Sequence, residues 1–266
     1  MKNDSRSNQT VKGGSRTRVS GKLVPAVERA VAILDRLSGA EQTLSLSLLA
    51  RELGLPKSSV HGLCHTLCAL RLLRPQGNGY VLGAHVLHWS QAFLATTDVV
   101  KEFHRLLAHD HRVGDHTVTL SCLDGADVVY LACRNSAAPL GFNFRIGMRL
   151  PAIYAATGKA MLARLGEQAL IAALPKPWPP TMTKNSVGTR ARLLAELAQV
   201  RQRGYALDDG QIRDGMVCLG AAICDANEIP VAGIAVSMTS TEATSAVIAR
   251  TGAAMVAIGR ELSQRI

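Results

Sequence analysis

The sequence lacks the apolar segments that direct proteins into or across membranes. No apolar run reaches the roughly 18 residues that a membrane-spanning helix needs. The N-terminus also lacks the apolar stretch of a secretory signal. We therefore expect a cytoplasmic protein without a membrane partner.

Common reaction motifs are missing as well. The sequence contains no Gly-x-Ser-x-Gly and no His-Glu-x-x-His. The Gly158-Lys159 pair is not a phosphate-binding loop, because Ile153 stands where that motif needs glycine and Ala160 stands where it needs serine or threonine. We expect no enzyme activity, no catalytic residue and no cofactor.

Patterns of metal ligands and paired carboxylates are weak. The six cysteines form no Cys-x-x-Cys pair, and most lie in apolar runs, as small core residues do in a reducing compartment. His104, His109, His111 and His116 have spacings that do not place three of them on one helical face. Asp208 and Asp209 are adjacent, so on a strand their side chains point apart. Metal sensing is an alternative that these spacings do not support, and we expect no metal.

Acidic residues are outnumbered by basic ones. The chain has 30 Lys and Arg against 20 Asp and Glu, a formal net charge of +10, which favours a polyanionic partner. Residues 1–22 are basic and have almost nothing to bury, so we expect a disordered basic tail. The tail either adds non-specific phosphate contacts or is a solvated leader without a role.

A helix-turn-helix pattern occupies residues 45–67. A first helix is predicted from about Leu46 to Leu53, and Gly54 follows it because glycine accepts a left-handed backbone. Pro56 begins the second helix, where its missing N–H costs nothing. Apolar residues recur along this second helix at helical spacing and predict a buried face. They are Val60, Leu63, Cys64 and Leu67.

The other face of the second helix is short, basic and rich in donors, as a helix in the DNA major groove needs near its N-terminus. We assign contacts with base edges or nearby phosphates to Lys57, Ser58, Ser59, His61 and His65. Residues 72–82 predict a hairpin wing around Gly77-Asn78-Gly79. Arg71, Arg74 and Asn78 are assigned to the DNA backbone. The alternative is a helical hairpin inside an ordinary helical domain.

Two further helices flank this region. Residues 24–37 predict a support helix with one apolar stripe, formed by Val27, Ala30, Val31, Leu34 and Leu37. Residues 83–95 predict a helix that is apolar over much of its surface, with Val86, Leu87, Trp89, Phe93 and Leu94. Such a helix packs either on its own domain or against its twin in a dimer, and we favour the dimer.

The remaining residues predict a mixed domain. Helices are expected over 99–111, 158–165, 190–203 and about 241–264, and strands over 117–123, 128–133, 216–224 and 231–238. Residues 142–146 are a candidate third strand, and four prolines make 174–180 an irregular loop. The first hairpin alternates in polarity and should be half-buried. Strands bracketed by helices, with hairpin connections, indicate an α+β domain with an antiparallel sheet.

The last two predicted strands each have one bulky face and one face of small residues. Two small faces side by side leave space that a small molecule can occupy, or a helix can pack closely against them. The helix after Ala156 has Thr157 as a plausible N-cap, and Arg145 and Arg149 lie shortly upstream. A carboxylate ligand at this helix end is the natural hypothesis.

The whole chain resembles the IclR family of bacterial transcription regulators over about residues 24–264. The motifs that carry the resemblance are Ala26-Val-Glu-Arg-Ala-Val-Ala-Ile-Leu34, Leu55-Pro-Lys-Ser-Ser-Val-His61, Tyr80-Val-Leu-Gly83, Gly147-Met-Arg-Leu-Pro151, Thr157-Gly-Lys-Ala160, Gly204-Tyr-Ala-Leu-Asp-Asp209 and the strand around Cys218. The resemblance implies a winged helix-turn-helix domain over 23–83, a linker helix over 84–97 and a GAF-like effector domain over 98–266, in dimers or tetramers.

The resemblance also implies an effector pocket. Its lining would be Ala156, Thr157, Asp208, Cys218, Ala235 and Ser237. Two residues depart from the family: Ala235 stands where members that bind small oxoacids have a hydroxyl, and Gly62 stands where the recognition helix often has arginine.

The resulting hypothesis is a dimeric regulator of promoter DNA, modulated by a small organic acid. Two rivals remain open. One is an enzyme acting on a small carboxylate in the C-terminal cavity, and the other is a thiol redox switch at Cys64 or Cys68.

Overall fold

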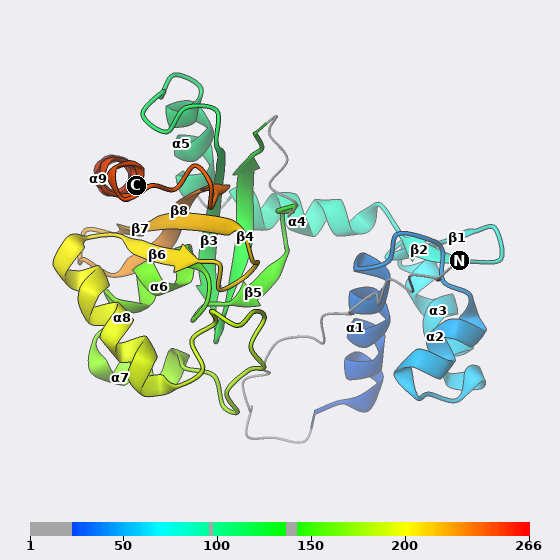
Figure 1. Cartoon of the computed structure of the whole chain (residues 1–266). Coiled ribbons are helices and arrows are strands. Elements are labelled where there is room, and N and C mark those ends of the chain that lie inside the picture. The colour runs from blue at the N-terminus through cyan, green and yellow to red at the C-terminus, as the bar shows by residue number, and fades with distance from the viewer. Residues whose placement is uncertain (1–22, 96–97, 137–142) are drawn as a thin grey trace, which may run out of the picture. The chain divides into compact units, whose positions relative to one another are not determined.

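The computed structural model describes residues 23–95, 98–136 and 143–266. The chain divides near residue 97 into two compact units (Figure 1). The predicted basic tail, residues 1–22, lies outside the described residues. No helix in the described part is long and apolar enough to cross a membrane.

The N-terminal unit is a helix-turn-helix followed by a two-stranded wing. Its elements are α1 (Pro25–Ser38), α2 (Leu46–Leu53), α3 (Lys57–Ala69), β1 (Leu73–Gln76), β2 (Gly79–Leu82) and α4 (His85–Ala95). The Ser45 hydroxyl accepts a hydrogen bond from the backbone N–H of Leu48 and caps α2. Gly54 follows α2 with φ +64, so the predicted left-handed helix end is confirmed.

The core of this unit differs in one respect from the prediction. Val27 and Val31, two members of the predicted stripe on α1, are exposed. The buried residues of α1 are Ile33 and Leu37, with Ala30 and Leu34 packed beside them. The contact face of α1 is thus rotated toward Ile33, which the sequence pattern had left off the stripe.

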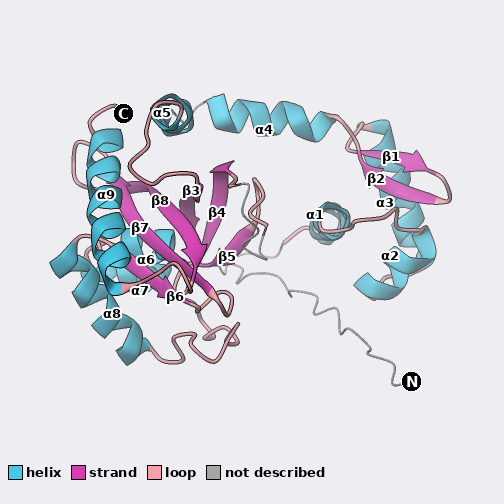
Figure 2. Cartoon of the chain, turned by 45° about the horizontal axis from the view of Figure 1, so that its top comes forward, coloured by secondary structure: helices cyan, strands magenta, loops and turns pink. Residues whose placement is uncertain are grey.

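The C-terminal unit contains an antiparallel sheet with helices on both faces. The elements are α5 (Asp98–Leu107), β3 (Thr117–Asp124), β4 (Asp127–Arg134), β5 (Arg149–Pro151), α6 (Ala156–Leu162), α7 (Glu167–Ala173), α8 (Arg190–Arg203), β6 (Ala206–Asp209), β7 (Met216–Cys224), β8 (Pro230–Thr239) and α9 (Ser245–Ser263). In the described residues the strand order is β5-β4-β3-β8-β7-β6. Helices α6 and α8 cover one face, and α5 and α9 cover the other (Figures 1 and 2). The predicted α+β class is confirmed.

Several local predictions for this unit are wrong. Residues 117–121 are buried on both faces, so the first hairpin is not half-buried. The third strand comes at Arg149–Pro151 rather than 142–146, of which residue 142 lies outside the described part. The helices predicted over 99–111 and 241–264 are shorter, and α7 and β6 were not predicted. Helices on both faces of the sheet remove the polarity alternation on which such predictions depend.

The small faces of β7 and β8 lie side by side and are covered by α6. In register, Gly220 lies opposite Ala235, and Ala222 opposite Gly233. A Cβ on Gly220 would lie 2.6 Å from the carbonyl carbon of Ala156, and one on Gly233 would lie 2.8 Å from the carbonyl oxygen of Thr157. At these two glycines, close helix packing is therefore the correct alternative, and any ligand space must lie further along the strands.

Candidate DNA-binding surface and effector site

The recognition surface of α3 is open to solvent. Lys57, Ser58, His61 and His65 are exposed, and Ser59 is half-buried. The opposite face supplies Val60, Cys64 and Leu67 to the core. Because Pro56 provides no side-chain cap, the first N–H groups of the 13-residue helix stay available to an anion.

The wing brings the predicted backbone contacts to the surface of the same unit. Arg74 on β1 and Asn78 in the turn are exposed, as is Arg71, which has φ +59 where the chain turns from α3 toward β1. Gly79 is tightly constrained, since a Cβ there would lie 2.6 Å from the carbonyl oxygen of Leu44. Tyr80 exchanges backbone hydrogen bonds with Leu44, which fastens the wing to the segment before α2.

The two cysteines of α3 are poorly suited to redox sensing. Burial, with a contribution from neighbouring Cys68, raises the pKa of Cys64 to about 11. Burial also raises the pKa of Cys68. Since the thiolate is the reactive form, both pKa shifts disfavour oxidation at neutral pH.

The predicted effector residues come together on the α6 face of the sheet. Asp208, Cys218 and Ser237 form one row across β6, β7 and β8. The Sγ of Cys218 and the Oγ of Ser237 lie 3.2 Å apart. Ala235 lies two residues before Ser237 on β8 and opposite Gly220 of β7. All of the predicted effector residues are buried.

Thr157 has a different role from the one predicted. The N-cap of α6 is Ala155, which makes no side-chain cap, and Thr157 lies inside the helix. Its Oγ1 instead accepts a 2.7 Å hydrogen bond from the Ser121 hydroxyl. Arg149 is an ion-pair partner of Asp124 and Asp127. An anion at the start of α6 would therefore meet the uncapped backbone N–H groups of the helix, but not Arg149, which is engaged by two carboxylates.

Asp208 belongs to a buried polar network that sequence reasoning missed. Its Oδ1 accepts a 2.6 Å hydrogen bond from the backbone N–H of Gln211, whose side-chain amide donates to Glu196. Glu196 also accepts from the fully buried Lys159 Nζ at 3.0 Å, which in turn donates to the carbonyl of Leu207. The sequence feature that could have indicated this network is Lys159 of the Thr157-Gly-Lys-Ala160 motif, because it is the one charged residue of α6.

One oxygen of Asp208 makes no close hydrogen bond, although Cys218, directly opposite on β7, interacts with the Asp208 carboxylate, which raises the pKa of Cys218 after the larger effect of burial. Among the described residues, Oδ2 of Asp208 is buried without a hydrogen bond, and so is Oε1 of Gln211. Burial raises the pKa of Asp208 to about 6, although nearby Lys159 and the backbone N–H groups of Gln211 and Ile212 act to lower it. The site therefore holds a desolvated carboxylate, which favours protonation or a ligand with a donor.

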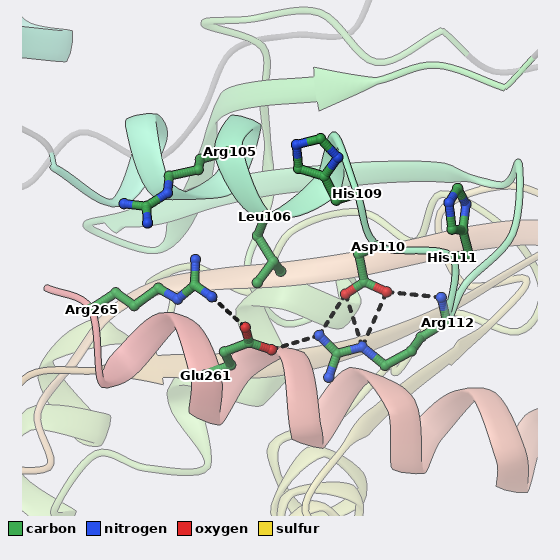
Figure 3. A pocket seen from close by; sticks show the side chains of 8 residues that line it. All are labelled: Arg105, Leu106, His109, Asp110, His111, Arg112, Glu261 and Arg265. Carbon is green, nitrogen blue, oxygen red and sulfur yellow. Dashed lines mark hydrogen bonds and ion pairs between the residues drawn. The ribbon is translucent and has the colours of Figure 1, made fainter.

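A separate surface depression of about 700 Å³ lies between α5, the segment after it and α9 (Figure 3). Its arginines are occupied: Arg112 pairs with Asp110 and Glu261, and Arg265 pairs with Glu261. Hydrogen bonds from Arg112 lower the pKa of Asp110 despite its burial, which acts in the opposite direction. Arg112 thus fastens the segment after α5 to α9, and the depression contains none of the predicted effector residues.

The histidine cluster of the sequence does not assemble in space. His104, His109 and His111 are exposed, and the Nδ1 of His116 lies 2.9 Å from the carbonyl oxygen of Val113. Across residues 23–95, 98–136 and 143–266, no group of three or more potential ligands is placed to hold a metal ion.

A winged helix-turn-helix with an exposed polar ridge, and a separate sheet domain with a buried polar site, define a class: DNA-binding regulators with a sensor domain. Two family profiles match the chain, the IclR helix-turn-helix domain over residues 26–77 and the bacterial transcriptional regulator IclR C-terminal domain over residues 91–264. The chain belongs to the IclR family of transcriptional regulators.

Individual relatives agree over almost the whole chain. The repressor BlcR of Agobacterium tumefaciens is 44% identical, with 91% of this chain and 97% of BlcR covered and a TM-score of 0.60. The regulator XynR of Escherichia coli is 28% identical, covering 92% and 98% of the two chains. An IclR homologue from Microbacterium hydrocarbonoxydans complexed with 4-hydroxybenzoate has a TM-score of 0.73 at 17% identity, covering 91% and 100%, and so shares the fold.

Proposed function

We propose that this regulator binds operator DNA as a dimer or tetramer and that a small organic acid in the C-terminal unit alters that binding. The observation that carries the DNA part is the exposed ridge of Lys57, Ser58 and His61 at the start of α3. A regulator of chromosomal DNA works in the bacterial cytoplasm, where we place the protein.

The DNA contacts divide into two groups. Lys57, Ser58, Ser59, His61 and His65 approach base edges or nearby phosphates in the major groove. Arg71, Arg74 and Asn78 hold the phosphate backbone from the wing side. The basic tail, residues 1–22, adds non-specific phosphate contacts.

We assign three functional regions to the chain. Residues 23–83 form the DNA-binding domain, residues 84–97 the linker helix, and residues 98–266 the effector-binding and oligomerisation domain. Helix α4 supports self-association, because Leu87 is 67% exposed and Trp89 is 51% exposed on a helix of 11 residues. A second copy of α4 is a suitable partner, since two-fold dimers match operator half-sites. The side chain of Leu94, another of the apolar residues predicted on this helix, lies outside the described part of the structure.

The effector site is assigned to Ala156, Thr157, Asp208, Cys218, Ala235 and Ser237. Support comes from the row of Asp208, Cys218 and Ser237 on one sheet face, and from the relative that binds 4-hydroxybenzoate. An effector changes DNA binding only through its different affinities for the DNA-competent and DNA-incompetent states.

The DNA part of the proposal is tested by measuring the affinity for mixed-sequence duplex DNA over a range of salt concentrations. We expect log K to fall with log salt by a slope of about −0.9 for each phosphate contacted. Replacing Lys57 by Ala should make the slope less negative by about 0.9, whereas Lys184→Ala, on the other unit, should not change it. A flat salt response of the wild-type chain contradicts DNA binding through this surface.

Self-association is tested with Leu87→Glu, which places a charge on the exposed face of α4. We expect the sedimentation coefficient to fall toward that of a smaller species while the far-UV circular dichroism is retained. Asp98→Ala, at the start of α5, serves as a charge-changing control. An unchanged assembly in Leu87→Glu contradicts the role of α4.

The enzyme alternative has one supporting feature, the buried Asp208 with a raised pKa. Turnover of a small carboxylate by the purified chain would support this alternative and count against a purely regulatory site. The redox alternative is tested by replacing Cys64 and Cys68 with serine. An oxidant response of DNA binding that disappears in this double variant would favour it.

A further inference from the structure

Two histidines lie close together at the start of α4. His85 is the first residue of the helix and His88 follows three residues later, so both side chains project from the same side of its first turn. The centres of their imidazole rings are 5.8 Å apart. We propose that His85 and His88 bind a divalent transition-metal cation of the zinc and nickel class. The spacings that argue against a metal at residues 104–116 do not apply to this pair.

The distance between the two rings fits a shared cation. Zinc lies about 2.0–2.1 Å from a coordinating imidazole nitrogen, which places it roughly 3.2 Å from the centre of the ring. Two rings that share one cation therefore have centres at most about 6.4 Å apart, and the observed 5.8 Å lies within this limit. Zinc enzymes use a similar pair, two histidines four residues apart on one face of a helix.

The ring nitrogens of this pair are available to a cation. Neither imidazole makes a hydrogen bond or an ion pair with another residue in the described part of the chain. His88 is exposed and His85 is half-buried, so a hydrated cation can reach both. A neutral imidazole has one nitrogen with a free lone pair, and that nitrogen coordinates metals. Zinc, nickel and copper prefer imidazole, whereas magnesium and calcium prefer oxygen ligands, so the pair selects the first group.

His85 is held in place by its backbone and by Trp89. The backbone N–H of His85 donates to the carbonyl of Arg71 at 3.3 Å, and that of Gly83 donates to the carbonyl of Leu72 at 2.7 Å. The imidazole of His85 lies edge to face with the Trp89 ring, at 5.2 Å between centres and 81° between planes. Because these contacts already restrict His85, a cation loses less binding free energy to ordering this ligand.

Two protein ligands make an open site. Structural zinc sites have four protein ligands and catalytic ones three, and among the described residues no group of three or more is placed to hold a metal ion. Water completes the coordination at His85 and His88, and binding is weaker than in a structural zinc site. Both ligands belong to one helical turn, so a bound cation stabilises the turn with which α4 begins, and thereby the folded state.

The emission of Trp89 reports binding at this site. The chain contains two tryptophans, so the Trp178→Phe variant of the full, untagged chain leaves Trp89 as the sole emitter. Ni²⁺ is the probe, because it binds imidazole and quenches tryptophan emission at short range. We expect saturable quenching by Ni²⁺, and recovery of the emission when Zn²⁺, which does not quench, is added in excess. Adding His88→Ala should weaken Ni²⁺ binding by about tenfold or more, since even the loss of an outer-shell partner of a metal ligand costs 10- to 100-fold.

His104→Ala is the matched control, because it removes an exposed histidine from the other unit and should leave the quenching curve unchanged. His61 and His65 of α3 are also exposed and one turn apart, but binding there would not respond to His88→Ala. The proposal is overturned if quenching does not saturate, if Zn²⁺ does not restore the emission, or if His88→Ala gives the control curve.

Calorimetric titration of Ni²⁺ into chains that keep both tryptophans makes the test independent of Trp178→Phe. The heat of one binding site should be present in the wild-type chain and in His104→Ala, and should be lost in His88→Ala. Equal heats in the wild-type chain and His88→Ala overturn the proposal as well.

Discussion

Gly62 provides a direct test of how α3 meets DNA. It lies in the middle of the recognition helix, is exposed, and has no atom within 4 Å of the position that a Cβ would occupy. Its φ is not in the left-handed region. Nothing in the fold of this unit therefore requires glycine at this position, and a larger side chain can be added without a clash.

Two substitutions separate stability from DNA contact. Gly62→Ala should raise the free energy of unfolding of the N-terminal unit by about 1 kcal/mol, because glycine is that much less favourable than alanine in an exposed helix interior. Gly62→Arg should give a similar gain in stability and also place a guanidinium beside His61 and His65. One added phosphate contact steepens the salt slope by about 0.9, which corresponds to roughly fivefold tighter binding near 0.15 M salt.

The assay is urea denaturation for stability and fluorescence anisotropy with a labelled mixed-sequence duplex for DNA binding, at four or more salt concentrations. Gly62→Ala is the control for the DNA measurement, because it stabilises the helix without adding charge. If Gly62→Arg binds DNA with the same salt slope as Gly62→Ala, residue 62 does not face the phosphates. The orientation assigned to the exposed face of α3 would then be wrong.

Three further predictions concern the C-terminal unit. Gly220→Ala should destabilise the chain by about 1–3 kcal/mol in urea denaturation, because the added Cβ would press on the α6 backbone. Gly166→Ala, which has open space around the added Cβ, should not destabilise the chain. Equal stability of the two variants would contradict the close approach of α6. Lys159→Met should lower the free energy of unfolding by about 3 kcal/mol, because it leaves Glu196 partly unpaired. The double variant with Glu196→Gln should regain part of that stability. If it regains none, loss of the ion pair is not the cause of the destabilisation. Because burial raises the pKa of Asp208 from an ordinary 3.8 to about 6, its protonated form stabilises the fold below pH 4, and this stabilisation is lost as the pH rises through 6. Asp208→Asn should therefore be more stable than wild type by up to about 3 kcal/mol at pH 8, with the difference vanishing near pH 4; a pH-independent difference would refute this account.

The helix-turn-helix could be predicted closely because its signals are local. Ser45, Gly54 and the Gly77-Asn78 turn each act within a few residues, and the structure places the helix and strand ends at the predicted positions. The DNA-facing residues are exposed, so an amphipathic pattern separates them from the core. The orientation of α1 was harder to predict, because valines fit either a buried or an exposed face and only the packing decides.

The effector unit could be predicted less completely because its sheet is covered on both faces. Thr117, Thr119 and Ser121 are buried rather than exposed. Their polar side chains therefore led to a wrong prediction of burial for this strand. Resemblance to the family pointed to Asp208, Cys218 and Ser237, whose proximity follows from a strand register that sequence pattern alone does not give. The network of Lys159 with Glu196 joins residues 37 positions apart, and such pairing is set by tertiary structure.

The buried carboxylate of Asp208 also limits how an effector at the proposed site could switch the protein. A ligand that bonds Asp208 equally well in both DNA-competent and DNA-incompetent states would stabilise the fold without changing DNA affinity. If the proposed effector contacts Asp208, regulation requires the two states to differ there, and the segment beginning at Gln211 is suited to produce that difference, because its backbone N–H holds Oδ1. The cost of one unpaired buried acceptor, about 1–3 kcal/mol, is of the same size as the coupling free energies found in allosteric proteins, about 1–3 kcal/mol. An effector at the proposed site that satisfied one buried acceptor in only one of the two states would thus be able to change DNA affinity by roughly 5- to 150-fold.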